Sequence, residues 1–176
     1  MNQLDIFGSD IYEYLFVIEP DHETSGRVIS MRNNLNRLIS LPEEVLHSKP
    51  HISLCYFEAR DFSDQFIRTK TKQVLSSLQP FDVQIIGSEI WKNGTFILKV
   101  NPNEHTLELQ KQLSLAFKGV IKNLHLTIAR SMPVEMISTI PMELFDYQGR
   151  FPCKSIYILK KKHPDPYQLL ETIQLG

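Results

Sequence analysis

A four-residue pattern that occurs twice constrains the fold of this chain more than any other feature. His51–Leu54 reads His-Ile-Ser-Leu and His125–Ile128 reads His-Leu-Thr-Ile, so both follow the formula histidine, apolar, hydroxyl, apolar. The second histidine follows the first by 74 residues (125 − 51). Each copy lies in a short apolar run of the kind that forms a buried β-strand. A helical pattern stands before and after each run, which predicts an α+β protein with two similar halves.

The alternation of side chains along a strand places the polar groups of each copy together. His51 with Ser53, and His125 with Thr127, would each project an imidazole and a hydroxyl from one face, with the aliphatic residues turned to the core. Two such pairs across a cleft supply the groups needed for acid–base chemistry on a phosphate ester. The alternative is two ordinary core histidines. Two accidental matches are expected in only about one of a thousand chains of average composition, which favours a shared site.

At these residues the chain resembles the two-histidine (2H) phosphoesterase superfamily, which includes 2′-5′ RNA ligase-like proteins and cyclic nucleotide phosphodiesterases. The family is marked by two H-x-[ST]-apolar motifs in a chain of about this size. The resemblance is specific over Lys49–Leu54, which has the Pro-His start common in the family, and Asn123–Arg130, which has Leu124 where Pro is common. It implies a bilobal α+β fold whose two pseudo-symmetric antiparallel sheet-and-helix halves face a central cleft, with one histidine from each half.

Hydrophobic periodicity and turn residues predict the elements of one bilobal domain over residues 1–176. Strands are predicted over residues 12–19, 51–57, 81–91, 95–100, 143–151, 153–160 and 167–175, with the second histidine strand beginning near residue 124. Helices are predicted over residues 25–39, 62–78 and 103–117, and a short one after Ser131. Asn93-Gly94 predicts a hairpin turn, and Asn103 predicts a helix N-cap.

The predicted catalytic residues are His51 and His125. A neutral imidazole can take a proton from the attacking water or hydroxyl, and a protonated one can give a proton to the leaving oxygen. Histidine suits both roles because its ordinary pKa of about 6.5 lies near neutral pH. Ser53 and Thr127 are predicted to bind the phosphate oxygens and hold the group in line. The sequence leaves open which histidine is the acid and which the base.

Three further residues are predicted to bind substrate. Arg130 would lie on the face opposite to His125 by strict alternation, unless the strand bulges or ends there. The family resemblance nevertheless implies a phosphate contact, since an arginine is common at this place. Phe57 shares the face of His51 by alternation and is predicted to stack a base at the rim of the cleft, and Tyr14 is a second aromatic candidate. The alternatives are a surface arginine and two core aromatics.

Charge and composition limit the partners of the chain. The formal net charge is −1, without the basic surface that grips duplex DNA, so a small phosphate ester or the end of an RNA strand remains compatible. The family resemblance implies a nucleotide or RNA end with a cyclic or 2′-5′ phosphodiester as the ligand. No apolar run is long enough to span a membrane. Cys55 and Cys153 have no metal-ligand spacing and no carboxylate cluster accompanies the histidines, so no metal or other cofactor is predicted. Reduced cysteines suit the cytoplasm, and we expect a monomer there.

Three functions fit the pattern. The first is a metal-independent phosphodiesterase that acts on 2′,3′-cyclic phosphates or on 2′-5′ linked nucleotide or RNA ends. The second is a non-catalytic nucleotide or RNA-end binding module of the same fold, and the third is a structural protein in which the motifs are only core strands. Retention of both histidines and both hydroxyls favours the enzyme. The natural substrate, and hydrolysis against ligation, stay open.

Overall fold

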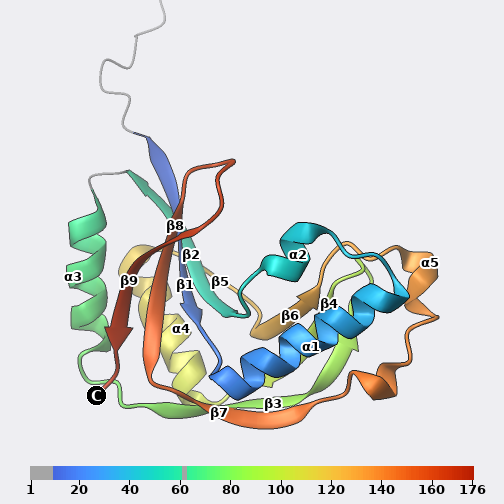
Figure 1. The fold of residues 1–176 in the computed structure, drawn as a ribbon. Helices are drawn as coiled ribbons and strands as arrows, with labels where there is room; N and C mark the ends of the chain where they lie inside the picture. The colour runs from blue at the N-terminus through green and yellow to red at the C-terminus, as the bar shows by residue number, and fades with distance from the viewer. Residues whose placement is uncertain (1–9, 61–62) are drawn as a thin grey trace, which may run out of the picture.

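The computed structural model describes residues 10–60 and 63–176 of the chain. The described strands are β1 (Ile11–Ile18), β2 (Ile52–Arg60), β3 (Phe81–Ile90), β4 (Phe96–Asn101), β5 (Val120–Ile121), β6 (His125–Ala129), β7 (Gln148–Cys153), β8 (Ser155–Lys161) and β9 (Gln168–Gln174). The described helices are α1 (His22–Leu38), α2 (Glu43–His47), α3 (Asp64–Leu75), α4 (Glu104–Phe117) and α5 (Val134–Ile137), with a 3₁₀ turn η2 (Met142–Leu144) (Figure 1).

The strands form one curled antiparallel sheet with the two histidine strands at its centre. The order is β7-β3-β4-β6-β2-β1-β8-β9, and β5 pairs with β2. We call β2, β1, β8 and β9 the His51 half, and β6, β4, β3 and β7 the His125 half. The two halves meet where Ile52 of β2 pairs with Leu126 of β6. The predicted α+β architecture of two antiparallel sheet-and-helix halves is confirmed, and the halves are parts of a continuous sheet.

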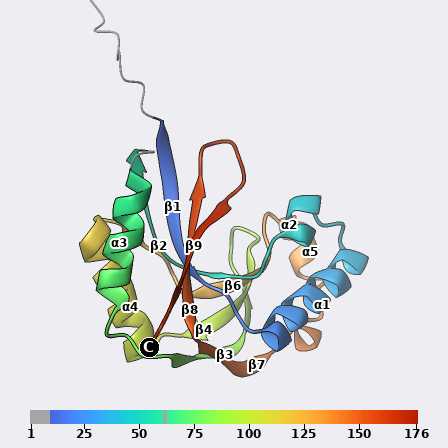
Figure 2. The same cartoon turned by 60° about the vertical axis from the view of Figure 1, so that its left-hand side comes forward.

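Each histidine strand packs against a helix that follows a strand of the other half in the sequence. Helix α1 follows β1 of the His51 half but packs on β6, and α4 follows β4 of the His125 half but packs on β2 and β5. Figure 2 shows α1, α2 and α5 on one side of the molecule and α3 and α4 on the other. This exchange of helices ties the two halves together and brings each helix under the other half's motif.

Local capping signals fix where these two helices begin. The Asp21 side chain accepts a hydrogen bond of 2.9 Å from Thr24 N, so α1 starts three residues before the predicted start at residue 25. The predicted Asn103 cap is confirmed, because its side chain accepts from Thr106 N while the Thr106 hydroxyl accepts from Asn103 N. Such a cap stabilises a helix by about 1 kcal/mol.

Several predicted boundaries are wrong. The strand predicted from residue 143 begins at Gln148, after η2. Helix α3 ends at Leu75 rather than 78, and the predicted start of that helix, Phe62, lies outside the described residues. The short helix after Ser131 begins only at Val134, with Pro133 as N-cap. Helix α2 and strand β5 were not predicted because they are too short to carry a periodic signal.

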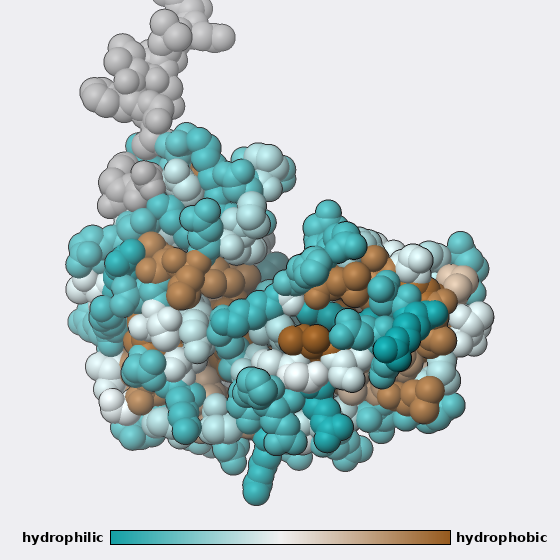
Figure 3. Space-filling view, in the orientation of Figure 1, coloured by the Kyte–Doolittle hydropathy of each residue, from teal (hydrophilic) through white to brown (hydrophobic). Residues whose placement is uncertain are grey.

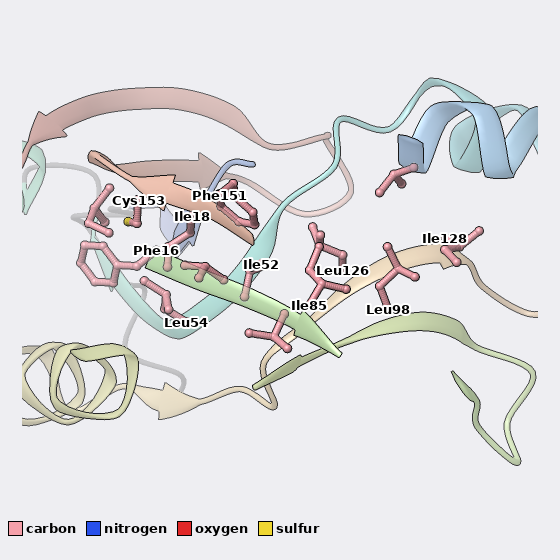
Figure 4. Packing of buried hydrophobic residues seen from close by; sticks show 14 of the residues in the cluster. Phe16, Ile18, Ile52, Leu54, Ile85, Leu98, Leu126, Ile128, Phe151 and Cys153 are labelled. Carbon is pink, nitrogen blue, oxygen red and sulfur yellow. The ribbon is translucent and has the colours of Figure 1, made fainter. Parts of the chain in front are cut away.

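The aliphatic residues of both motifs meet in one core. Ile52, Leu54, Leu126 and Ile128 are all fully buried and belong to a single cluster (Figure 4). Their burial turns the histidines and hydroxyls to the opposite face of the sheet, where all four are half-buried. Among the described helices, none combines the length and the apolar character that a membrane crossing needs.

Candidate active site

The register of the two central strands brings the two motifs into contact. Because Ile52 pairs with Leu126 in antiparallel fashion, His51 lies beside Thr127 and Ser53 lies beside His125. The two histidines are therefore diagonal neighbours, a relation that places residues about 7–8 Å apart, with their Cβ atoms somewhat closer. One phosphate group can span that separation and accept or donate hydrogen bonds to both rings. The sequence could supply the two motifs but not this register.

The two imidazoles are held by the same backbone contact. Nδ1 of His51 lies 2.9 Å from the carbonyl oxygen of Lys49, and Nδ1 of His125 lies 2.7 Å from that of Asn123. A carbonyl oxygen only accepts, so each Nδ1 carries the hydrogen and donates it. Each Nε2 is then an acceptor in the neutral ring and a donor in the protonated ring. Both rings thus keep the nitrogen that can exchange a proton with a substrate.

The surroundings favour the neutral form of both rings. Burial is the largest cause that lowers the pKa of His51 and of His125. The positive charge of Arg130 lowers both pKa values further, Arg32 adds to the effect on His51, and His51 adds to that on His125. The carbonyl contacts act in the opposite direction, as does Glu19 on His51. A bound anion would reverse the balance and favour a proton on one ring.

Each histidine strand contains a β-bulge at the last residue of its motif. The pairing of β2 with β1 skips Leu54, and the pairing of β6 with β4 skips Ile128. In each strand the skipped residue and the residue after it both point inward. These pairs are fully buried: Leu54 and Cys55 in β2, and Ile128 and Ala129 in β6. A bulge inserts one residue and shifts the alternation by one position. The repeat of the bulge shows that the two motifs share backbone geometry beyond their four residues.

The shifted alternation brings the fifth residue after each histidine to the histidine face. These residues are Tyr56 in β2 and Arg130 in β6, and both line the same groove as His51. The condition under which Arg130 could reach the site, a bulge in its strand, is met. Tyr56 was missed by the sequence analysis. The signal that could have found it is its position in the repeat, because it stands as far from His51 as Arg130 does from His125.

Two cavities meet at His51 and Arg130. The main groove, of about 400 Å³, runs toward the β8–β9 hairpin and is lined by Glu13, Leu15, His51, Ser53, Tyr56, Lys122, Arg130, Lys161 and Tyr167. The α2 cavity, of about 210 Å³, is lined by Arg32, Glu44, Val45, Ser48, Lys49, His51, Thr127, Ile128 and Arg130. In Figure 3 the surface is hollowed between the β8–β9 hairpin and α2. His125 lines neither cavity, and the Trp91 ring packs edge-on against it with centroids 4.7 Å apart.

The prediction that Tyr14 and Phe57 bind substrate is wrong. Tyr14 is 0% exposed and Phe57 is 8% exposed, and their rings stack in the core with centroids 5.3 Å apart. The bulge at Leu54 is the physical reason, because it turns Phe57 inward and Tyr56 outward. Tyr14 pairs with Phe57 in the sheet and shares its inward direction, and its hydroxyl donates to Asp64 Oδ1 at 2.5 Å.

The described part of the chain offers few groups for other chemistries. Within residues 10–60 and 63–176, no three histidine, cysteine, aspartate or glutamate side chains gather as a metal site would require. Burial raises the pKa of Cys55 to about 11 and of Cys153 to about 12, so both stay protonated thiols at neutral pH. The neutral thiols therefore supply no nucleophile at neutral pH, and of the two motif imidazoles only that of His51 lines the main groove.

Comparison with known proteins now places the chain in a family. The model of the 2′-5′ RNA ligase superfamily matches residues 20–165. The chain belongs to this superfamily. The match confirms the resemblance to the 2H phosphoesterases seen in the sequence, and membership supports an enzyme that acts on phosphodiesters. No curated protein matches the chain.

Solved structures of low sequence identity share the fold. LigT of E. coli complexed with phosphate is 16% identical, with a TM-score of 0.71 over 96% of this chain and 99% of that one. TT0787 of Thermus thermophilus is 14% identical, with a TM-score of 0.71 over 93% and 97%. Usb1 of Kluyveromyces marxianus is 12% identical, with a TM-score of 0.54 over 93% and 98%. This superfamily fold is therefore retained over nearly the whole chain.

Proposed function

We propose that this protein is a metal-independent phosphodiesterase that acts on 2′,3′-cyclic phosphates or 2′-5′ linked nucleotide or RNA ends by two-histidine acid–base catalysis. The observation that carries the proposal is the diagonal placement of His51 and His125 on one sheet face. Both rings present the same nitrogen, since both Nδ1 atoms donate to the backbone. Each imidazole also has a hydroxyl beside it on the adjacent strand, Thr127 or Ser53.

In hydrolysis of a cyclic phosphate, water attacks phosphorus between the two rings. The neutral imidazole takes the proton of the water as the new P–O bond forms. The bond from phosphorus to one ribose oxygen breaks, and the protonated imidazole gives its proton to that oxygen. The product is a phosphate monoester, and the two rings have exchanged protonation states. Ser53 and Thr127 donate hydrogen bonds to the remaining oxygens, and the charge of Arg130 opposes the negative charge of the phosphate.

The electrostatics of the free site suit this cycle. Burial and the charge of Arg130 lower the pKa of both imidazoles and so favour the neutral base, while the acid needs a proton. The incoming phosphate supplies negative charge that raises the pKa of the rings, and a proton is taken up with the substrate. We expect the activity to follow a bell-shaped pH profile with its acid limb below the ordinary histidine pKa of about 6.5.

The nucleoside attached to the phosphate has room in the main groove. Tyr56 and Tyr167 line it, and the Lys122 ammonium lies 3.9 Å from the centre of the Tyr56 ring. Aromatic faces of this kind stack unpaired bases, and lysines approach backbone phosphates. LigT of E. coli, of the same fold, has been solved with 3′-AMP, with ATP and with NADP+. These complexes support a nucleotide as the ligand of this groove.

The test is a screen of 2′,3′-cyclic nucleotides and 2′-5′ linked oligonucleotides with purified protein. The variants are His51→Ala and His125→Ala, and the matched control is His22→Ala, an exposed histidine at the start of α1. We expect turnover by the wild type that survives exhaustive chelation, is retained by the control and is lost in both motif variants. A double motif variant with the wild-type rate would overturn the proposal. Binding without turnover would point instead to a nucleotide-binding module.

A further inference from the structure

A buried arginine on α1 joins the two histidine motifs through their backbones. Arg32 is 2% exposed. Its Nε donates to the carbonyl oxygen of Ile128 at 2.9 Å and its Nη2 to that of Thr127 at 2.9 Å, while its Nη1 donates to that of Ser48. Thr127 and Ile128 belong to the His125 motif, whereas Ser48 lies in the segment that leads into His51. One side chain thus fixes the backbone next to both imidazoles.

A buried glutamine on α4 makes the corresponding contacts on the other side. Gln110 is 3% exposed. Its Nε2 donates to the carbonyl oxygen of Leu54 at 3.0 Å and to that of Lys122 at 2.7 Å. Leu54 is the last residue of the His51 motif, and Lys122 lies in the segment that leads into His125. The Lys122 backbone N–H also donates to Leu54 O at 3.0 Å, which closes the same junction.

The acceptors of the two side chains occupy equivalent positions. Ser48 and Lys122 each stand three residues before a histidine, and Leu54 and Ile128 each stand three residues after one. Arg32 therefore joins the approach to His51 with the end of the His125 motif. Gln110 joins the approach to His125 with the end of the His51 motif. The helices that carry them are the two that the halves exchange. Because all four acceptor positions match, the same bracing contact is repeated in the two halves of the fold.

We infer that Arg32 and Gln110 are a pair of positioning residues, the cross-brace, which sets the relative placement of the two imidazoles. The inference rests on the proposed acid–base function and goes beyond it, because neither side chain belongs to the histidine motifs. The cross-brace also holds the two bulges, since Leu54 and Ile128 are the skipped residues. The bulges in turn aim Tyr56 and Arg130 into the groove.

Physical chemistry explains why polar side chains are needed at these two buried positions. A regular strand points successive carbonyls to opposite edges, but the Arg32 guanidinium donates to both Thr127 O and Ile128 O, so the bulge has turned them to one side. Buried carbonyls that leave the ladder need another donor. An apolar residue in place of Arg32 would remove the side-chain donor of Thr127 O and Ile128 O. An apolar residue in place of Gln110 would remove that of Lys122 O, while Leu54 O would keep the Lys122 N–H. In either case the segment before the histidine would be less firmly held.

The two braces differ in charge. Of the described carboxylates, none forms an ion pair with Arg32. Its guanidinium donates hydrogen bonds to backbone carbonyl oxygens instead. Arg32 lines the α2 cavity together with Arg130, and burial, with the repulsion of the Arg130 charge, lowers the pKa of Arg32 to about 10. It still carries its charge at neutral pH. The Arg32 brace therefore also raises the positive potential at the phosphate position, whereas the Gln110 brace does not.

The closing experiment compares Arg32→Met and Gln110→Met with Thr71→Val. Thr71 is fully buried on α3 and donates to Ile67 O, so its variant loses a buried hydrogen bond far from the groove. For both brace variants we expect kcat to fall about ten- to a hundredfold, because small misplacements of catalytic groups have effects of that size. KM for a cyclic nucleotide should change less than threefold in Gln110→Met and rise more in Arg32→Met. The control should lower the melting temperature alone.

A second readout does not depend on turnover. The imidazole signals of His51 and His125 in an NMR titration with inorganic phosphate report ring placement directly. We expect both brace variants to shift the resting signals, and Arg32→Met alone to weaken phosphate binding several-fold. If the wild type binds phosphate but turns over no substrate, the proposed function fails while the cross-brace is still decided by these signals. If a methionine variant does not fold, Arg32→Lys and Gln110→Asn take its place. Brace variants with wild-type kcat and wild-type signals would overturn the inference.

Discussion

The His51 half and the His125 half share their backbone devices and differ in the side chains that the substrate would meet. Both histidines donate Nδ1 to the carbonyl two residues before them, and both motifs end in a bulge. The residue after the bulged pair, however, is Tyr56 in one half and Arg130 in the other. In the proposed mechanism, the repeated parts would place a proton-exchanging nitrogen on each side of a phosphate. The divergent side chains, Tyr56 and Arg130, would then contact different parts of the proposed substrate.

A second difference lies around the imidazoles themselves. The Trp91 ring packs against His125, whereas His51 lines both the main groove and the α2 cavity. The charges that shift the two pKa values also differ. Arg130, Arg32 and Glu19 act on the pKa of His51, whereas Arg130 and His51 act on that of His125. The symmetric frame therefore holds two rings in unequal surroundings. Substitutions at equivalent positions of the two halves can separate effects of the shared backbone geometry from effects of the different side chains.

The largest effect is expected where the halves are equivalent. His51→Ala and His125→Ala should each lower kcat by about 10²–10⁴-fold, the usual contribution of a general acid or base. Removal of both should cost little more than removal of one, since the two rings act as a unit. Steady-state kinetics on a cyclic nucleotide measure this. A loss confined to one half would show that the second imidazole only positions the substrate.

A smaller and unequal effect is expected at the fifth residue after each histidine. Arg130→Met should lower kcat/KM by about 10²–10³-fold, as does loss of a group that stabilises charge in the transition state. It should also raise the pKa of both imidazoles, because Arg130 lowers both. The base then becomes protonated at a higher pH, so the acid limb of the kcat/KM profile should move upward. A limb that stays in place would place Arg130 away from the reacting groups.

The equivalent change in the other half should act on binding. Tyr56→Leu removes an aromatic face from the main groove and leaves charge unchanged. Stacking of a base on such a face contributes about 1–3 kcal/mol, so KM should rise by roughly five- to a hundredfold at nearly constant kcat. The comparison of purine with pyrimidine cyclic nucleotides measures it. Tyr12→Leu, outside this groove, is a suitable aromatic control.

Features that depend on neighbouring residues were predictable, and features that depend on a partner strand were not. The motifs, the hairpin at Asn93-Gly94 and the cap at Asn103 were predictable, because each depends on residues adjacent in the chain. The directions of Phe57 and Arg130 were not, because a bulge is visible only against the partner strand. Periodicity likewise shows that α1 and α4 have a buried face but not which strand covers it. That is why Arg32 and Gln110 carried no signal of their own, and why Tyr56 required a comparison of the two repeats.

The smallest expected effect concerns Trp91 and sharpens the difference between the two rings. Burial is the largest cause that lowers the pKa of His125, and the Trp91 ring is part of the surface that removes water from it. Trp91→Ala should therefore raise the pKa of His125 toward its ordinary value and leave that of His51 nearly unchanged, since Trp91 lines neither cavity at His51. Separate NMR titrations of the two rings measure both values, and Trp91→Phe, which keeps an aromatic ring, is the matched control. Equal shifts in both histidines would mean that the rings share one environment, and the unequal surroundings of the two halves would then have no functional weight.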